Sequence, residues 1–159
     1  MKIQSLIVLT GPTGVGKTAL TLDIAQHYGI EIINADSRQI YKELQIGTAA
    51  PTKAQLERVK HHFVASKNVN DYYSASLYEQ DVLELLKANP SSTYILSGGS
   101  MMYVDAVCYG IDEIPTIDNK VRQDLMKMYE TEGLNKLCDL LKDLDPAHWD
   151  IVDKQNPRR

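Results

Sequence analysis

A glycine-rich segment near the start of the chain carries the most specific chemical signal. It reads Gly-Pro-Thr-Gly-Val-Gly-Lys-Thr and matches the phosphate-binding pattern G-x-x-x-x-G-K-[ST] at every fixed position. Its glycines let successive backbone N–H groups face a polyphosphate, and a helix that begins there adds positive partial charge. The Lys17 ammonium group would neutralise phosphate charge, and the Thr18 hydroxyl can ligate Mg²⁺. The predicted phosphate-binding residues, for a nucleoside triphosphate or a diphosphate ester, are Gly11, Pro12, Thr13, Gly14, Val15, Gly16, Lys17 and Thr18.

A single carboxylate, Asp36, directly follows the isoleucine-rich run of residues 30–35. If that run is a strand of a parallel sheet, Asp36 lies at the strand's carboxyl end, where ligands bind in such folds. There it could accept a proton from a nucleophile or bind a metal-bound water. The alternative role is an N-cap for residues 37–41. Arg38 and Gln39 come next and could contact a phosphate or a base edge, although such a pair is more often only solvated.

A second glycine turn, Ser97-Gly98-Gly99-Ser100, follows another short apolar run. Two adjacent glycines allow the backbone to approach a ligand closely. The Ser100 hydroxyl could hold a diphosphate oxygen, or it could cap the helix that follows.

The elements that must position these residues alternate between strand and helix. Short apolar runs predict strands, and longer amphipathic segments between them predict helices. We expect strands over 3–9, 30–35 and 93–96, and helices over 18–28, 53–61, 74–88 and 101–109. This alternation predicts an α/β fold of the P-loop NTPase-like kind, a parallel sheet flanked by helices on both faces.

The pattern changes after Gly110. From residue 118 onward the sequence shows helical periodicity and no convincing strand, with two separate apolar stripes in residues 121–129 and 134–141. We therefore expect two parts, a P-loop α/β core over 1–111 and the beginning of a helical domain over 112–159. The last residues do not resemble a natural end, so we expect this chain to be the first part of a longer protein.

Composition excludes several classes of protein. The 159 residues are 43% hydrophobic and 24% charged, which is enough to bury a core. The longest apolar run is far shorter than a membrane span or signal-peptide core, so we expect a cytoplasmic protein with no membrane partner. The cysteines, Cys108 and Cys138, form no metal or disulfide pattern. The net charge of −4 argues against a sequence-blind nucleic-acid coat but leaves room for a local basic groove.

Four segments together resemble one family, the tRNA dimethylallyltransferases, also called tRNA isopentenyltransferases. After the phosphate loop these are Asn-Ala-Asp-Ser-Arg-Gln-Ile-Tyr at 34–41, Ile-Gly-Thr-Ala-Ala-Pro at 46–51 and Gly-Gly-Ser-Met-Met-Tyr at 98–103. The phosphate loop occurs in many families, whereas the segments at 34–41 and 46–51 are far more specific to this family. The resemblance covers essentially the whole chain and implies a continuation of similar length.

The resemblance implies transfer of a dimethylallyl group from dimethylallyl diphosphate to the exocyclic amine of an adenosine beside the anticodon. Pyrophosphate would leave, so the phosphate loop would hold a diphosphate rather than ATP, with Mg²⁺ at Thr18. Asp36 matches the family's general base, and Ser100 stands where a threonine is usual, so both are candidate catalytic residues. The tRNA anticodon stem-loop would be contacted by Asp36, Ser37, Arg38, Gln39, Ser100, Arg122, Arg158 and Arg159. A monomer is expected.

Three other functions remain open on the residues alone. A small-molecule P-loop kinase has the same loop but needs lid arginines, and no arginine cluster is evident among the five in this chain. An adenylate isopentenyltransferase, which makes cytokinins, would use the same diphosphate site but would not need the helical part. The third open function is that of a module that binds a nucleotide without catalysing a reaction.

Overall fold

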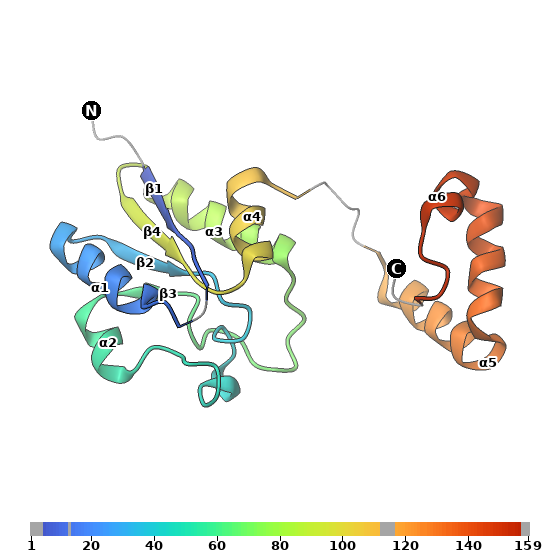
Figure 1. Cartoon of the computed structure of the whole chain (residues 1–159), viewed down its shortest axis with the longest axis horizontal. Helices are drawn as coiled ribbons and strands as arrows, with labels where there is room; N and C mark the ends of the chain where they lie inside the picture. Colours follow the sequence, from blue (N-terminus) through green and yellow to red (C-terminus); the bar gives the residue numbers. More distant parts are fainter. Residues whose placement is uncertain (1–4, 13, 112–116, 157–159) are drawn as a thin grey trace. The chain divides into compact units, whose positions relative to one another are not determined.

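The structure is a computed structural model that describes residues 5–12, 14–111 and 117–156. The chain divides into two compact units, residues 1–112 and 113–159 (Figure 1). No described helix is both long enough and apolar enough to cross a membrane.

The first unit is built on a parallel four-stranded sheet with the strand order β1-β4-β2-β3. The strands are β1 (Ser5–Leu9), β2 (Glu31–Asn34), β3 (His61–His62) and β4 (Thr93–Ser97). The register pairs Ser97 at the end of β4 with both Leu9 and Asn34. The carboxyl ends of the three longer strands therefore meet at one edge of the sheet, and the segments that follow them must come together there. The strand β1, at the side of the sheet, pairs with β4 alone among the described strands.

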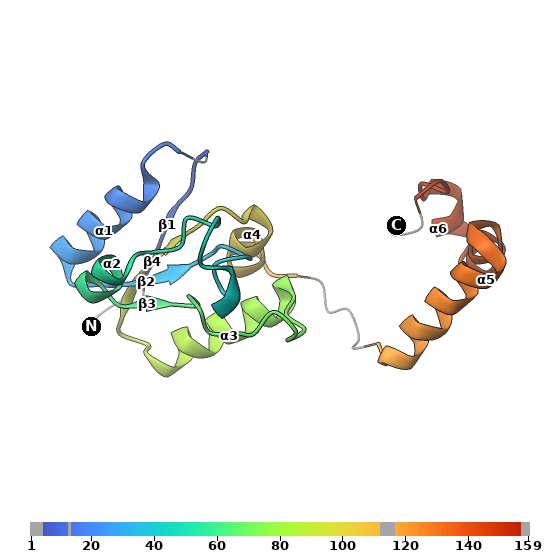
Figure 2. The same cartoon turned by 90° about the horizontal axis from the view of Figure 1, so that it is seen from below.

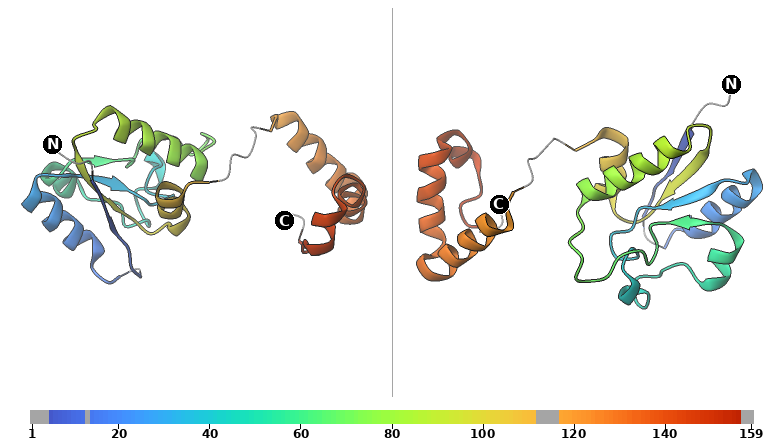
Figure 3. Two further views of the ribbon diagram at one scale, coloured as in Figure 1. Left: turned by 90° about the horizontal axis from the view of Figure 1, so that it is seen from above. Right: turned by 180° about the vertical axis from the view of Figure 1, so that it is seen from behind.

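Helices cover both faces of this sheet (Figures 2 and 3). Neighbouring residues of a strand point to opposite faces. Ile33 of β2 and Leu96 of β4 accordingly pack with the helices α3 (Ala75–Ala88) and α4 (Met101–Tyr109). Ile32 and Ile95 pack on the other face, with α1 (Lys17–Tyr28). A parallel sheet with helices on both faces confirms the predicted P-loop NTPase-like α/β arrangement. The helices lie on opposite faces because right-handed crossovers run in opposite directions along the sheet.

Local signals explain where the helices begin and end. Ser74 caps α3 by accepting a hydrogen bond from the Leu77 N–H, and Thr52 forms a capping box with Gln55 at the start of α2 (Lys53–Arg58). Gly29 ends α1 in the left-handed conformation, with φ of 62°, directly after the last residue of the helix expected over 18–28.

One predicted boundary is wrong. The helix expected over 53–61 ends at Arg58, and His61–His62 forms the edge strand β3. Val59 turns inward beneath α1 and is 8% exposed, so burial rather than helical periodicity determines the path of the chain there. A short 3₁₀ helix, Lys42–Leu44, lies in the connection between β2 and α2.

The second unit is helical, and its described residues contain no strand. The helix α5 (Asn119–Leu144) is interrupted at Gly133, where φ of 81° and ψ of 178° are not helical, so it consists of the two helices expected from the two apolar stripes. The helix α6 (Pro146–Ile151) is capped by Asp145, whose side chain accepts a hydrogen bond from the His148 N–H. The Trp149 ring lies beneath the ammonium groups of Lys142 and Lys154, at 4.8 and 4.2 Å.

Candidate active site

A pocket of about 440 Å³ opens at the carboxyl ends of β1, β2 and β4. It brings together the phosphate loop, the segment after β2, the loop before α2 and the glycine turn after β4, which lie far apart in the sequence. The lining residues are Gly14, Gly16, Lys17, Thr18, Thr21, Ile32, Asn34, Asp36, Gln39, Thr48, Ala49, Pro51, His61, Ser97, Gly98 and Gly99.

The phosphate loop connects β1 to α1, as a phosphate-binding loop requires. Gly14 and Gly16 have φ of 84° and 93°, a region that favours glycine. The Lys17 ammonium group donates hydrogen bonds to the carbonyl oxygens of Gly11 and Pro12, at 2.6 and 2.7 Å. The Lys17 side chain thus folds back over its own loop, with Thr18 beside it in the pocket wall. Of the other predicted loop residues, Gly11, Pro12 and Val15 belong to the loop without lining the pocket, and Thr13 lies outside the described residues.

The two carboxylate oxygens of Asp36 have different surroundings. Oδ1 accepts hydrogen bonds from the backbone N–H groups of Arg38 and Gln39, at 2.9 and 3.2 Å. Oδ2 lies against Gly99, where an added Cβ would come within 3.1 Å of it, and Asp36 lines the pocket. The two roles considered for Asp36 are therefore compatible, since one oxygen holds the turn while the other can act in the pocket.

The Ser100 hydroxyl links two of the segments that form the pocket. It accepts a hydrogen bond from the Ser37 N–H at 2.8 Å and donates one to the Ser37 hydroxyl at 2.9 Å. Ser100 precedes α4 but makes no side-chain capping bond to that helix, and it does not line the pocket. The contact that the structure shows for this hydroxyl is with the turn that carries Asp36.

The glycine turn after β4 passes unusually close to the backbone after β2. The backbone N–H of Ser100 donates to the Ala35 carbonyl oxygen at 3.0 Å. A Cβ at position 98 would lie 2.2 Å from both the carbonyl carbon and the carbonyl oxygen of Ala35. Only glycine fits there without displacement of one backbone segment, so Gly98 sets the distance between Asp36 and the turn.

The loop of residues 45–51 contributes Thr48, Ala49 and Pro51 to the pocket wall, and Gln39 holds this loop in place. The Gln39 side-chain amide donates to the carbonyl oxygens of Thr48 and Ala49, at 2.9 and 3.2 Å. Arg38 differs, because its side chain is exposed and does not line the pocket. The predicted tRNA contact of Gln39 thus involves an amide whose two N–H donors are already engaged within the protein.

Several polar residues of the pocket were not among the predicted site residues. The buried Thr21 hydroxyl donates to the Ser97 hydroxyl at 3.1 Å, which joins α1 to the end of β4. The Asn34 amide donates to the Phe63 carbonyl at 3.4 Å. Both Asn34 and Ser97 end strands, so the rule that ligands bind at carboxyl ends could have identified them.

His61 is another pocket residue that was not predicted. Its Nδ1 lies 2.8 Å from the Val59 carbonyl oxygen, and burial lowers its pKa, which favours a neutral imidazole. No sequence signal marked it, because its place in the pocket depends on a strand of two residues.

The remaining predicted site residues lie elsewhere. Arg122 is exposed on the first part of α5, in the second unit. Arg158 and Arg159 lie outside the described residues.

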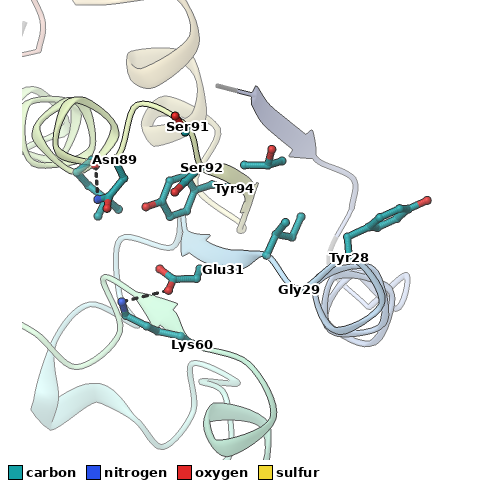
Figure 4. Close-up of a pocket in the computed structure, with 11 residues that line it drawn as sticks. Tyr28, Gly29, Glu31, Lys60, Asn89, Ser91, Ser92 and Tyr94 are labelled. Carbon is teal, nitrogen blue, oxygen red and sulfur yellow. Dashed lines mark hydrogen bonds and ion pairs between the residues drawn. The ribbon is translucent and has the colours of Figure 1, made fainter. Parts of the chain in front are cut away.

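A second hollow, of about 540 Å³, lies at the opposite edge of the sheet, where β2 and β4 begin (Figure 4). Its charged residues are already paired with protein groups: Glu31 binds Lys60 at 3.2 Å and His62, outside the lining, at 2.6 Å. No predicted site residue lines this hollow. The chemistry is therefore concentrated at the carboxyl edge.

The parallel sheet, the loop between β1 and α1 and the pocket at the strand ends define a protein of the P-loop NTPase-like class. Within that class, the model of the IPP transferase family matches residues 39–159. The chain belongs to the IPP transferase family, as the resemblance of its motifs predicted.

Relatives of known name support this assignment. tRNA dimethylallyltransferase 1 of Phocaeicola vulgatus is 58% identical over 98% of this chain and 53% of its own length. The protein of the same name from Bacteroides fragilis is 54% identical over 100% of the chain and 54% of its own. The chain thus spans about half the length of the curated relatives it matches.

Solved structures give the same result for the fold. The full-length tRNA isopentenylpyrophosphate transferase of Bacillus halodurans matches with a TM-score of 0.63 and 28% identity, over 100% of this chain and 53% of that one. A eukaryotic dimethylallyltransferase acting on tRNA matches with a TM-score of 0.77 over 99% of this chain and 39% of that one. At 22% identity, this second likeness supports the fold alone.

Proposed function

We propose that this chain holds the catalytic core of an enzyme that transfers a dimethylallyl group from dimethylallyl diphosphate to tRNA. The acceptor is the exocyclic amine of an adenosine next to the anticodon, and pyrophosphate is released. The observation that carries the proposal is the position of Asp36, which lines the same pocket as Lys17 and Thr18 and whose Oδ2 lies beside Gly99, another residue of that pocket. A base and a diphosphate cradle in one pocket are what this transfer needs.

The phosphate loop would bind the diphosphate. Its backbone N–H groups and the start of α1 favour an anion, and the Lys17 ammonium group can exchange its carbonyl acceptors for phosphate oxygens. A Mg²⁺ ion fits the donor set, because Mg²⁺ commonly uses one or two protein oxygens together with phosphate oxygens and waters, and the Thr18 hydroxyl lines the pocket. When bound, Mg²⁺ would offset negative charge on the leaving pyrophosphate.

The Asp36 carboxylate would serve the amine. As the bond between the allylic carbon and the diphosphate oxygen breaks, a bond from that carbon to the exocyclic nitrogen forms. Asp36 Oδ2 accepts the proton that the nitrogen loses, and the electron pair of the broken bond leaves with pyrophosphate. Oδ1 meanwhile keeps its two backbone hydrogen bonds, so the carboxylate is already oriented before substrate binds.

The tRNA would be held by a local surface and by shape, since the chain carries a net charge of −4. Arg38 and Arg122 are exposed, as a phosphate contact requires. The target adenosine must leave its stack to reach Asp36. We place this reaction in the cytoplasm, carried out by a monomer without a membrane partner.

Mass spectrometry of RNA adenosines tests the proposal. We expect the whole protein, given dimethylallyl diphosphate and an anticodon stem-loop RNA, to add a single dimethylallyl group to the adenosine beside the anticodon. The matched reaction contains AMP in place of RNA. Transfer to AMP in preference to RNA would indicate an adenylate isopentenyltransferase instead, and release of ADP from ATP would indicate a kinase.

Replacement of Lys17 by alanine tests the cradle itself. Loss of one charge-assisted hydrogen bond of about 1.5–3 kcal/mol should weaken binding of dimethylallyl diphosphate by roughly 10- to 100-fold. Isothermal titration calorimetry measures the affinity. The control is Lys53→Ala, because Lys53 is exposed on α2, lies outside the pocket lining and forms an ion pair with Glu57 at 3.9 Å. Unchanged affinity in Lys17→Ala would count against the assignment of the loop.

A further inference from the structure

Ile46 is the most exposed large apolar side chain in the described part of the chain, at 98%. Single exposed apolar residues are common on protein surfaces, so exposure alone assigns no role. The position of Ile46 is less common: it stands at the tip of the 45–51 loop, whose other end forms a wall of the active-site pocket through Thr48, Ala49 and Pro51. An exposed apolar group thus stands beside the pocket, two residues before Thr48.

The protein holds this tip in place from both sides. Before it, the Gln45 amide donates to the Tyr41 carbonyl oxygen at 2.7 Å. After it, the Thr48 hydroxyl donates to the Leu44 carbonyl oxygen at 2.6 Å, and Gln39 binds the Thr48 carbonyl. These hydrogen bonds fix Gln45 and Thr48, which flank Ile46 in the loop. Ile46 can therefore contact a partner without the entropic cost of ordering the loop first.

The loop itself carries no charged side chain of either sign. Residues 45–51 read Gln-Ile-Gly-Thr-Ala-Ala-Pro and contain no acidic side chain that would repel phosphates. An adenosine that moves into the pocket leaves a gap in its stack, and proteins that open stacks often insert an apolar side chain between bases. Isoleucine is one of the side chains used in this way.

We propose that Ile46 is a wedge that enters the RNA stack next to the extruded adenosine and keeps that adenosine in the pocket. This inference rests on the proposed function, because it requires a stacked RNA substrate. It adds a residue that acts on the RNA rather than on the diphosphate, and it explains why an apolar side chain is held beside the pocket.

Replacement of Ile46 by serine should separate stacked substrates from unstacked ones. With the whole protein, we expect kcat/KM for the anticodon stem-loop RNA to fall about tenfold or more, because the gap is no longer filled. The rate with a short unstructured oligonucleotide, which has little stack to open, should change less than twofold, and affinity for dimethylallyl diphosphate should not change. The matched control is Val69→Ser, since Val69 is 51% exposed on a loop and does not line the pocket.

A second readout reports extrusion directly. With 2-aminopurine at the target position of the stem-loop, extrusion raises fluorescence, and Ile46→Ser should reduce that rise while Val69→Ser preserves it. Equal behaviour of Ile46→Ser and the unaltered protein would overturn the wedge. So would a lowered Tm with equal losses on both substrates, which would show that protein covers Ile46.

The two readouts also separate this inference from the proposed function. A fluorescence rise that depends on Ile46, without any dimethylallyl transfer, would support the wedge and refute the proposed chemistry. Dimethylallyl transfer that is equally fast with and without the Ile46 side chain would support the proposed chemistry and refute the wedge. No rise with the unaltered protein would refute the wedge.

Discussion

Asp36→Asn is expected to reduce dimethylallyl transfer by a factor on the order of 10² to 10⁴ while leaving the affinity for dimethylallyl diphosphate nearly unchanged. Asparagine keeps an oxygen where Oδ1 accepts from the N–H groups of Arg38 and Gln39, so the turn should survive. It replaces Oδ2, the oxygen beside Gly99, with an NH₂ group that cannot accept a proton. Single-turnover transfer rates and calorimetry with dimethylallyl diphosphate measure the two effects separately.

Asp36→Ala is the matched comparison, because it removes both oxygens. Its transfer rate should be as low as that of Asp36→Asn, and it should also lose the turn-capping bonds, at a cost of about 1 kcal/mol in the free energy of unfolding. A transfer rate in Asp36→Asn near that of the unaltered protein would show that the carboxylate only caps the turn.

Gly98→Ala is expected to destabilise the first unit by about 2–3 kcal/mol, which lowers Tm by roughly 10 °C. The added Cβ would lie 2.2 Å from the backbone of Ala35, and backbone cannot move aside as the end of a long side chain can. The strands β2 and β4 are paired up to Asn34 and Ser97, so the two segments would have to separate immediately beyond their last paired residues. Thermal and urea denaturation monitored by circular dichroism would measure the loss.

Gly99→Ala is the natural control, one residue further along. Its Cβ would meet only Asp36 Oδ2, at 3.1 Å, so the carboxylate must shift by a few tenths of an ångström. We expect a much smaller change in Tm than in Gly98→Ala, together with slower transfer. If Gly98→Ala and Gly99→Ala both have the Tm of the unaltered protein, the close approach at Gly98 does not constrain the fold.

Much of the site could be predicted because parallel α/β folds collect ligands at one edge. Once residues 30–35 and 93–96 are expected to be strands, Asp36 and the glycine turn must lie near the phosphate loop, whatever the ligand. The pocket contains both, together with Lys17 and Thr18. The family motifs added the identity of the diphosphate and the acceptor, which stay proposals for this chain.

The rest could not be predicted, because it depends on contacts between residues distant in sequence. The bonds between Ser100 and Ser37 join positions 63 residues apart, and no spacing rule announces them. The hold of Gln39 on the 45–51 loop uses backbone carbonyls, which every residue has. The two-residue strand β3 is too short to give a periodic pattern, so His61 was assigned to a helix.

The free side of β1 has a practical consequence. Within the described sheet, β1 presents five residues of unpaired backbone beside the partly exposed side chains of Ile7 and Val8, whereas the opposite side ends in only two residues of β3. A strand with one unused row of N–H and C=O groups is a template for further β-pairing. Association through this strand edge should therefore limit the concentration at which these residues stay in solution on their own. Charged side chains introduced into β1 should raise that concentration.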